Sequence, residues 1–256
     1  MIEKDFLGLR LIDEPIGSVV SFIESDRSSP ADCKVLVTPN VDHFSRLREQ
    51  RDGDEFSASY YSASLVVCDS RVIRILSRAF GQEILNVVPG SDLTKKLLGE
   101  PWLTSSKICV IGGLAKDLEC VSAAFGLNDC VHYNPPMGFI GDSAEVEKCI
   151  DFIFENNPEY VFLAVGSPRQ EILAKRIKER FCKVGGRVRF IFCIGASFDF
   201  LSGKVQRAPS WMQSMCLEWM HRAFSEPKRM IPRYFRNFMW ICRISARSFL
   251  RKIFKI

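Results

Sequence analysis

The chain has 256 residues, 47% of them hydrophobic and 25% charged, which is enough to bury one full core and leave an appendage. No run of 18 apolar residues is free of charge, and the start, with Glu3 and Asp5, is acidic. These features argue against a spanning helix and a secretory signal and predict a cytoplasmic protein. The ten cysteines form no C-x-x-C pair, so we expect reduced thiols, and three histidines without a Cys/His cluster argue against zinc.

Short apolar runs alternate with stretches of helical period along most of the chain. This rhythm predicts an α/β fold of the Rossmann-like type, a mostly parallel sheet with helices on both faces. The predicted strands are Lys34–Thr38, Leu65–Cys68, Leu85–Val88, Lys107–Gly112, Tyr160–Gly166 and Arg189–Gly195. The predicted helices are Val41–Gln50, Ser70–Phe80, Asp92–Leu98, Ala115–Phe125, Ser143–Asn156 and Pro168–Phe181.

Nearly every predicted strand ends in Gly, Ser, Thr, Asn or Asp, where ligands of such sheets bind. Asp69 follows a buried strand, so it is either a proton acceptor with a raised pKa or the cap of the next helix. Thr38 and Asn40 have the same two interpretations, and His43 is expected to be solvated or in the core. Gly166–Glu171 opens a helix with Pro168 as its first residue, which predicts either an anion site or an ordinary cap.

Two other motifs carry little weight. Gly112-Gly113 lacks the third glycine of a dinucleotide fingerprint, so a tight turn explains it as well as NAD binding does. Asp52-Gly53-Asp54 matches a metal-binding D-x-D pattern but follows a charged helix end, which favours a solvated turn. Without a metal, arginines would have to neutralise a leaving diphosphate.

The basic charge of the chain is concentrated at its C-terminal end. Residues 228–256 hold nine Lys or Arg and no Asp or Glu, which leaves a formal charge of −4 on residues 1–227 out of the total of +5. Large apolar residues alternate with these cations. Such a segment is typical of a helix that lies on an anionic membrane, where each cation contributes about 1 kcal/mol. A nucleic-acid tail would have more polar spacing.

We therefore predict two parts, a core over residues 1–206 and a helical membrane-associating appendage over residues 207–256. Pro209, Pro227 and Pro232 punctuate the appendage, and we expect no strand in it.

At these residues the chain resembles the WecG/TagA/CpsF glycosyltransferases, glycosyltransferase family 26, over roughly residues 5–236. The two long matching blocks, at 195–211 and 217–229, are specific. The matching motifs are T-P-N at 38–40, Asp69, G-S-D at 90–92, P-P-M-G-F at 135–139, G-S-P-R-Q-E at 166–171, G-A-S-F-D-F-L-S-G-K-V-Q-R-A-P-S-W at 195–211 and L-E-W-M-H-R-A-F-S-E-P-K-R at 217–229.

The resemblance implies a bacterial, metal-independent, inverting transferase of the GT-E type. Such enzymes move a hexose-type sugar from UDP to a polyprenyl-diphosphate-linked saccharide in polysaccharide biosynthesis, at the cytoplasmic face of the inner membrane. By motif match Asp69 is the general base, and no metal or cofactor is expected. The substrate-binding residues that the resemblance implies are Thr38, Asn40, Ser91, Asp92, Gly166, Gln170, Glu171, Arg207, Arg222 and Arg229.

One departure concerns the donor sugar. The family usually reads D-G-x-G after its aspartate, whereas this chain has Asp69-Ser70-Arg71-Val72, and Pro89 precedes the G-S-D motif. The donor sugar is therefore left open among hexoses and uronic acids. An alternative function is a non-catalytic, membrane-anchored module that binds nucleotide sugars, and self-association is a further expectation because the appendage is apolar.

Overall fold

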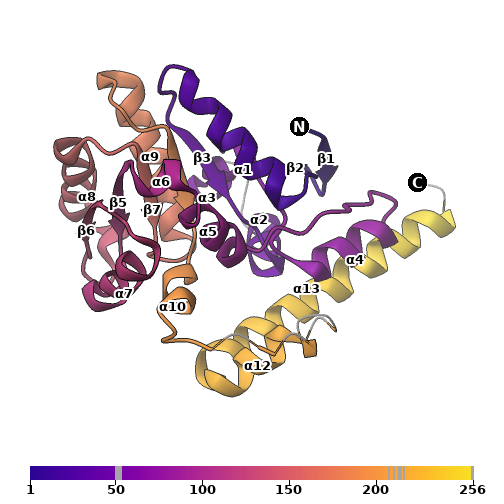
Figure 1. The fold of residues 1–256 in the computed structure, drawn as a ribbon. Helices are drawn as coiled ribbons and strands as arrows, with labels where there is room; N and C mark the ends of the chain where they lie inside the picture. The colour runs from indigo at the N-terminus through magenta and orange to yellow at the C-terminus, as the bar shows by residue number, and fades with distance from the viewer. Residues whose placement is uncertain (50–53, 207, 210, 213–214, 216, 255–256) are drawn as a thin grey trace.

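The computed structural model describes the whole chain except residues 50–53, 207, 210, 213–214, 216 and 255–256. It is an α/β structure with one parallel six-stranded sheet, helices on both of its faces and a long C-terminal helix (Figure 1). The strands are β1 Glu3–Phe6, β2 Leu9–Ile12, β3 Lys34–Val37, β4 Leu65–Val66, β5 Lys107–Ile111, β6 Asp129–Tyr133, β7 Tyr160–Leu163 and β8 Phe190–Cys193. The helices are α1 Ile16–Ser25, α2 Val41–Glu49, α3 Glu55–Tyr61, α4 Arg71–Ala79, α5 Gly90–Leu98, α6 Pro101–Thr104, α7 Ala115–Phe125, α8 Ser143–Asn156, α9 Arg169–Val184, α10 Ser197–Leu201, α12 Glu218–Ser225 and α13 Pro227–Phe254, with short 3-10 turns at Asp26–Ser28 and Phe139–Gly141.

The order of the strands is β4-β3-β8-β7-β5-β6, with every pairing parallel, and β1 and β2 form a separate antiparallel hairpin. The chain moves outward from β3 to β4 on one side and from β5 to β6 on the other, and β7 and β8 fill the centre. Carboxyl ends of parallel strands meet at one edge, so the loops after β3, β4, β5, β7 and β8 form a common crevice. The expected Rossmann-like class is confirmed.

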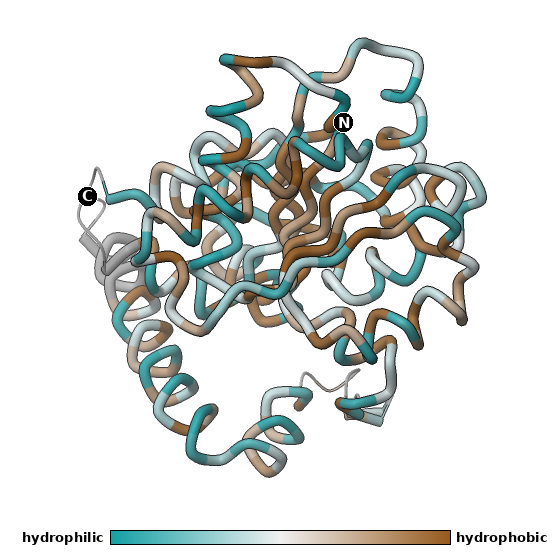
Figure 2. Tube along the Cα trace, turned by 90° about the vertical axis from the view of Figure 1, so that its left-hand side faces the viewer, coloured by the Kyte–Doolittle hydropathy of each residue, from teal (hydrophilic) through white to brown (hydrophobic). Residues whose placement is uncertain are grey.

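The sheet is buried on both faces because its strands alternate between two apolar cores. Val35 and Val37 of β3 point into one core, which α2, α4, α8 and α9 cover, whereas Leu36 points into the other, under α1, α5, α7 and α10. Figure 2 shows the hydrophobic strands in the middle of the molecule with helices on either side. All four residues of β7 and all four of β8 are buried, as their continuous apolar sequences predict.

The predicted strand Leu85–Val88 is wrong. The backbone N–H groups of Leu85 and Asn86 donate to the buried carboxylate of Asp13 at 2.8–3.2 Å, and Val88 N–H donates to the carbonyl of Cys68. A side chain thus takes the donors that a strand ladder would need. The missed strand β6 is a half-exposed edge strand, so it lacks the continuous apolar run that identifies buried strands.

The C-terminal part of the described chain is helical, as expected, and its last helix packs on the body. Met230 and Trp240 of α13 are buried, and Trp240 joins the same core as α2 and α4. None of the described helices is long and apolar enough to cross a bilayer. The division at residue 206 into a core and an appendage stays a prediction.

Candidate active site

The site is built around Asp69, which lies just past the carboxyl end of β4. Its Oδ1 accepts a 2.9 Å hydrogen bond from the backbone N–H of Gly90, the first residue of α5. The cap of the following helix α4 is Ser70, whose hydroxyl accepts from Ile73 N–H. Asp69 is therefore not the helix cap, and it lies half-buried between the end of β4 and the start of α5.

The neighbouring strand β3 brings Thr38 and Asn40 to the same edge. The side-chain amide of Asn40 hydrogen-bonds Asp69, and its Oδ1 accepts from Asp42 N–H at 3.1 Å, so Asn40 also caps α2. Thr38 lies against Gly90, where a Cβ atom would come within 3.0 Å of the threonine Oγ1. A glycine is thus needed for β3 and α5 to approach this closely, and both interpretations of Asn40, ligand of the site and cap, apply at once.

The helix α12 of the C-terminal part contributes charges to the site. Glu218 and Arg222 are both near enough to Asp69 to shift its pKa in opposite directions. Arg222 also lies over the ring of Phe200, with 4.7 Å from its guanidinium carbon to the ring centroid. Sequence analysis predicted Arg222 but missed Glu218, whose motif position alone did not distinguish it from a surface acid.

Burial raises the pKa of Asp69 to about 7. The Gly90 hydrogen bond opposes this shift, Glu218 adds to it, and Arg222 and the amide of Asn40 again oppose it. A carboxyl group with a pKa near neutrality is half ionised in the range where an enzyme works, which suits it to accept a proton.

Two cavities adjoin the strand ends. One, of about 380 Å³, lies between the turns after β5, β6 and β7 and is lined by Gly112, Gly113, the 134–137 loop and Arg169. The other, of about 480 Å³, lies beside Asp69 and is lined by Arg71, Arg74, residues 85–87, Pro89 and Asp92. The strands β4 and β7 are three positions apart, about 14 Å at normal strand spacing. The first cavity, at β7, and Asp69, after β4, therefore lie at separate places along the edge of the sheet.

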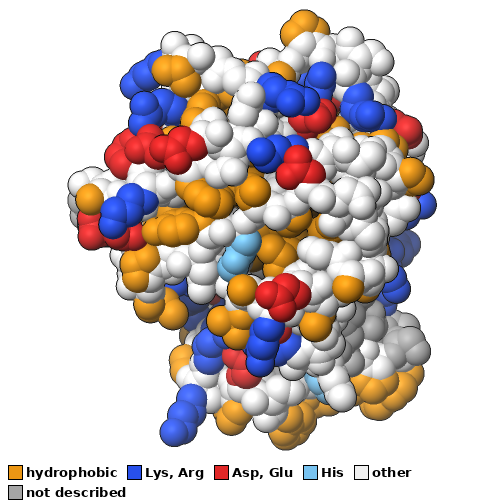
Figure 3. Space-filling model, turned by 60° about the vertical axis from the view of Figure 1, so that its left-hand side comes forward, with side chains coloured by type: hydrophobic (Ala, Val, Ile, Leu, Met, Phe, Trp, Pro, Cys, Tyr) orange, Lys and Arg blue, Asp and Glu red, His pale blue; other side chains and the backbone are white. Residues whose placement is uncertain are grey.

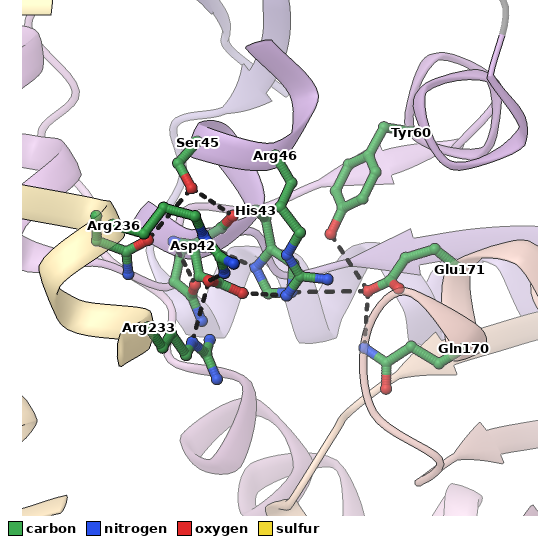
Figure 4. A network of polar contacts seen from close by, with 11 residues as sticks. Asp42, His43, Ser45, Arg46, Tyr60, Gln170, Glu171, Arg233 and Arg236 are labelled. Carbon is green, nitrogen blue, oxygen red and sulfur yellow. Dashed lines mark hydrogen bonds and ion pairs between the residues drawn. The ribbon is translucent and has the colours of Figure 1, made fainter. Parts of the chain in front are cut away.

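Gln170 and Glu171 do not line the crevice but lie beneath it, 4% and 2% exposed. The Gln170 Oε1 accepts from Gly195 N–H at 2.9 Å, and its Nε2 donates to Glu171 Oε1 at 2.9 Å. The same carboxyl oxygen accepts from Tyr60 and lies 3.9 Å from the Nε2 of His43 (Figure 4). His43 is thus a core residue, one of the two alternatives that the sequence leaves open.

The structure places the other predicted site residues as follows. Ser91 and Asp92 lie half-buried in the first turn of α5, and Gly166 lies in the turn after β7 with positive φ, under the guanidinium of Arg169. The helix α9 begins at Arg169, one residue later than predicted, with Pro168 just before it. Arg229 is exposed and paired with Glu226 at 2.8 Å. Arg207 and the pair Asp52-Gly53 lie outside the described residues, and Asp54 caps α3.

Some features of the site could not have been found by motif. Asp42 is 1% exposed and forms ion pairs with Arg46, Arg233 and Arg236, so α13 is fixed to α2 directly beside Asn40 (Figure 4). The described cysteines are all free thiols. Within the described part of the chain, no three His, Cys, Asp or Glu side chains gather as a metal site would require.

A parallel sheet with helices on both faces, and with a carboxylate and glycine turns along one edge, defines a Rossmann-like protein, the class in which ligands bind at that edge. The sequence model of the glycosyl transferase WecG/TagA/CpsF family matches residues 5–253, so the chain belongs to this family of glycosyltransferases.

Two relatives carry the same name, N-acetylglucosaminyldiphosphoundecaprenol N-acetyl-beta-D-mannosaminyltransferase. The protein of Bacillus spizizenii (strain ATCC 23059 / NRRL B-14472 / W23) is 27% identical over 244 residues, which cover 91% of this chain and 90% of that protein. The protein of Bacillus subtilis (strain 168) is 29% identical over 240 residues, which cover 90% of this chain and 82% of that protein. The similarity thus extends through the strand-end site and into the C-terminal helices.

Proposed function

We propose that this protein transfers a hexose-type sugar from a UDP-sugar to a polyprenyl-diphosphate-linked saccharide, with inversion and without a metal ion. The observation that carries the proposal is the ionisable Asp69 at the strand ends, in a chain similar to two enzymes named for a diphosphoundecaprenol acceptor. The beta linkage in those names and the family resemblance support inversion. The sugar itself stays open, because Ser70 and Val72 replace the two glycines of the usual D-G-x-G pattern and Arg71 adds a cation.

In the proposed reaction Asp69 accepts the proton of the acceptor hydroxyl while that oxygen attacks the anomeric carbon of the donor. The bond from that carbon to the phosphate oxygen breaks, and UDP leaves with the electron pair. The leaving diphosphate needs positive charge, which Arg169 beside the first cavity and Arg222 near Asp69 supply. The protonated Asp69 then returns its proton to water.

The test is turnover of an Asp69→Asn variant, measured as UDP release with a panel of UDP-sugars and an N-acetylglucosaminyl-diphosphate lipid. General-base catalysis contributes about a hundredfold to ten-thousandfold, so we expect a loss of that size with UDP binding retained. Asp129→Asn, an exposed carboxylate on the far edge strand, is the matched control. Full turnover of Asp69→Asn would show that Asp69 is not the general base. Loss of activity in EDTA would contradict metal independence, and binding of UDP-sugars without any release of UDP would favour the binding-module alternative.

We also propose that α12 and α13 place the enzyme on an anionic membrane surface. Four large apolar side chains of these helices, Phe224, Ile231, Phe235 and Phe238, are between 57% and 79% exposed. Figure 3 shows hydrophobic side chains at the lower end of the molecule, where α12 lies, next to Lys and Arg. Apolar side chains beside cations are typical of helices that lie in the bilayer interface.

The test of membrane association is sedimentation with vesicles of phosphatidylglycerol and phosphatidylcholine. Truncation is unsuitable, because α13 also supplies the buried Met230 and Trp240. The triple variant Ile231→Ser, Phe235→Ser, Phe238→Ser leaves those two residues in place, and we expect it to lose most of its vesicle binding while its turnover on a short, soluble acceptor remains. Sedimentation equal to that of the unchanged protein would refute the proposal.

A further inference from the structure

A cluster of buried polar side chains lies directly behind the carboxylate of Asp69. His43, on the first turn of α2, is 6% exposed, and its Nδ1 accepts a 2.9 Å hydrogen bond from the backbone N–H of Asn40. On the other side of the ring, Nε2 lies 3.9 Å from Oε1 of Glu171 (Figure 4). The imidazole therefore lies between the loop that contacts Asp69 and a buried carboxyl group of α9.

Glu171 is in turn held by Tyr60 and by its own neighbour in α9. Its Oε1 accepts from Tyr60 of α3 at 3.2 Å and from the Nε2 of Gln170 at 2.9 Å. The Oε1 of Gln170 accepts from Gly195 N–H, at the end of β8. Two direct hydrogen bonds thus hold this carboxyl oxygen, and β8 fixes the side chain that donates one of them, so the oxygen that faces His43 has a defined position.

The protonation state of the ring follows from its partners. Burial lowers the pKa of His43 to about 3, with Arg46 and Arg233 lowering it further and Asp42 opposing them, so the ring is neutral at physiological pH. Because Nδ1 accepts the Asn40 N–H, the ring proton is on Nε2, on the side of Glu171. Burial also raises the pKa of Glu171. The contact between them is therefore that of an imidazole N–H directed at a buried carboxyl group.

The orientation of Asn40 is fixed at both its backbone and its side chain. His43 holds its N–H, and the N–H of Asp42 binds its Oδ1, which leaves the side-chain NH₂ to donate to Asp69. An asparagine held in this way can point only its NH₂ group at Asp69, because the opposite orientation of the amide would lose both hydrogen bonds.

We propose that His43 is a positioning residue for the transfer reaction: held by Glu171, it fixes the Asn40 loop so that the Asn40 amide orients the Asp69 carboxylate toward the acceptor hydroxyl. The inference rests on the proposed function, because it assumes that Asp69 is the base. It also gives Gln170 and Glu171 a role beneath the crevice, since they are too buried to touch a sugar.

Two substitutions of His43 test its contact with Asn40 and its contact with Glu171 separately. In His43→Asn the amide oxygen is as many bonds from Cβ as Nδ1 is, so an acceptor for Asn40 N–H is kept. In His43→Gln the amide extends toward Glu171, and the acceptor for Asn40 is lost. A displacement of about 1 Å at a reacting group can cost a hundredfold in rate, so we expect kcat of His43→Gln to fall about tenfold to a hundredfold with KM for the donor unchanged. His43→Asn is expected to stay within a few-fold of the unchanged protein.

The pH dependence of kcat gives a readout that a purely structural role would not move. The groups that act on Asp69 are Gly90 N–H, Glu218, Arg222 and Asn40, and the hydrogen bond from Asn40 favours the charged form. When Asn40 is loosened, the pKa of Asp69 rises, so the midpoint of the pH profile of kcat moves to higher pH in His43→Gln and not in His43→Asn.

The control for general destabilisation is Ile150→Val, which removes one buried methyl group from α8, remote from the network. Equal losses of kcat in the two His43 variants, or a His43→Gln enzyme like the unchanged protein in kcat and pH midpoint, would overturn the inference. If His43→Gln does not fold, His43→Leu, which also removes the acceptor for Asn40 N–H, takes its place, and an unchanged pH profile would then refute the inference. A failure of the proposed function differs from these outcomes, because Asp69→Asn would then keep its turnover.

Discussion

The contact that fixes the C-terminal helix α13 to α2, next to Asn40, allows a quantitative test through Asp42→Asn. The Oδ1 of Asp42 lies 2.7 Å from Nη2 of Arg236 and 3.2 Å from Nε of Arg233, and Oδ2 pairs with Arg46. The carboxylate is 1% exposed, so the substitution leaves three guanidinium groups around a neutral amide.

Removing one partner of a buried ion pair costs about 3–5 kcal/mol. The arginine side chains are 20%, 28% and 46% exposed, so they can turn toward water, and we expect the lower end, about 3 kcal/mol. For a chain of this size that lowers the unfolding temperature by about 6–12 °C. The hydrogen bond between Ser45 and Asn237, 3.2 Å long and next to these ion pairs, is also expected to weaken.

The assay is urea unfolding at pH 7 followed by tryptophan fluorescence, since the buried Trp240 of α13 reports on this contact. Glu147→Gln is the control, because its carboxylate pairs with Arg180 at the surface and such pairs contribute about 0.2–1 kcal/mol. The arginines hold the pKa of Asp42 below its usual value against the effect of burial, so its stabilisation is complete above about pH 4 and is lost as the pH falls through the lowered pKa. Two results would refute the reasoning. One is a loss of unfolding free energy in Asp42→Asn that is no larger than that of Glu147→Gln at pH 7. The other is a loss that does not become smaller as the pH falls below about 4.

Two further predictions concern Asp69 and the turn after β5. Burial raises the pKa of Asp69 to about 7, so below pH 4 this carboxyl group is protonated in both the folded and the unfolded state and costs no stability. As the pH rises from 4 to 7 the group ionises in the unfolded state first, which lowers the free energy of unfolding. Asp69→Asn should therefore become more stable relative to the unchanged protein across that range in melting experiments, and a constant difference would contradict the burial argument. Gly112 has φ +93°, and a Cβ there would meet Val165 Cγ1 at 2.6 Å and the Ala164 carbonyl carbon at 2.9 Å, whereas Gly113, at φ +78°, has open space. Gly113→Ala is expected to lower the free energy of unfolding by about 1–2 kcal/mol from backbone conformation alone, and Gly112→Ala by more, with weaker UDP binding by calorimetry. Equal losses in the two variants would show that Ala164 and Val165, after β7, can move away from the added methyl group.

The sheet could be predicted from the sequence because its strands are local patterns. The runs at β7 and β8 are apolar throughout, and only a strand buried on both faces needs that composition. Leu85–Val88 is apolar except for Asn86 but is not a strand, since Asp13, 72 residues away in the sequence, takes the N–H of Leu85. Local composition does not reveal such a distant partner.

The candidate site was predictable in its position and less so in its contacts. Strand-end polar residues identify the crevice edge, and Asp69 and Asn40 meet there. The side chains of Gln170 and Glu171 look available for a sugar in the sequence, yet the packing of α3 and α2 over the start of α9 buries them. Glu218 joins the site only because α12 folds back across the sheet edge.

The sequence by itself determined that the C-terminal helix is basic and apolar, because helical spacing follows from residue order alone. It did not determine which apolar stripe faces the body. The tertiary structure directs Met230, Asn237 and Trp240 inward and leaves Ile231 and Phe235 exposed. That face is held against α2 by the ion pairs of Asp42 with Arg233 and Arg236. Asp42 and Arg236 are 194 residues apart in the sequence, so their contact exists only once the fold has brought both helices together.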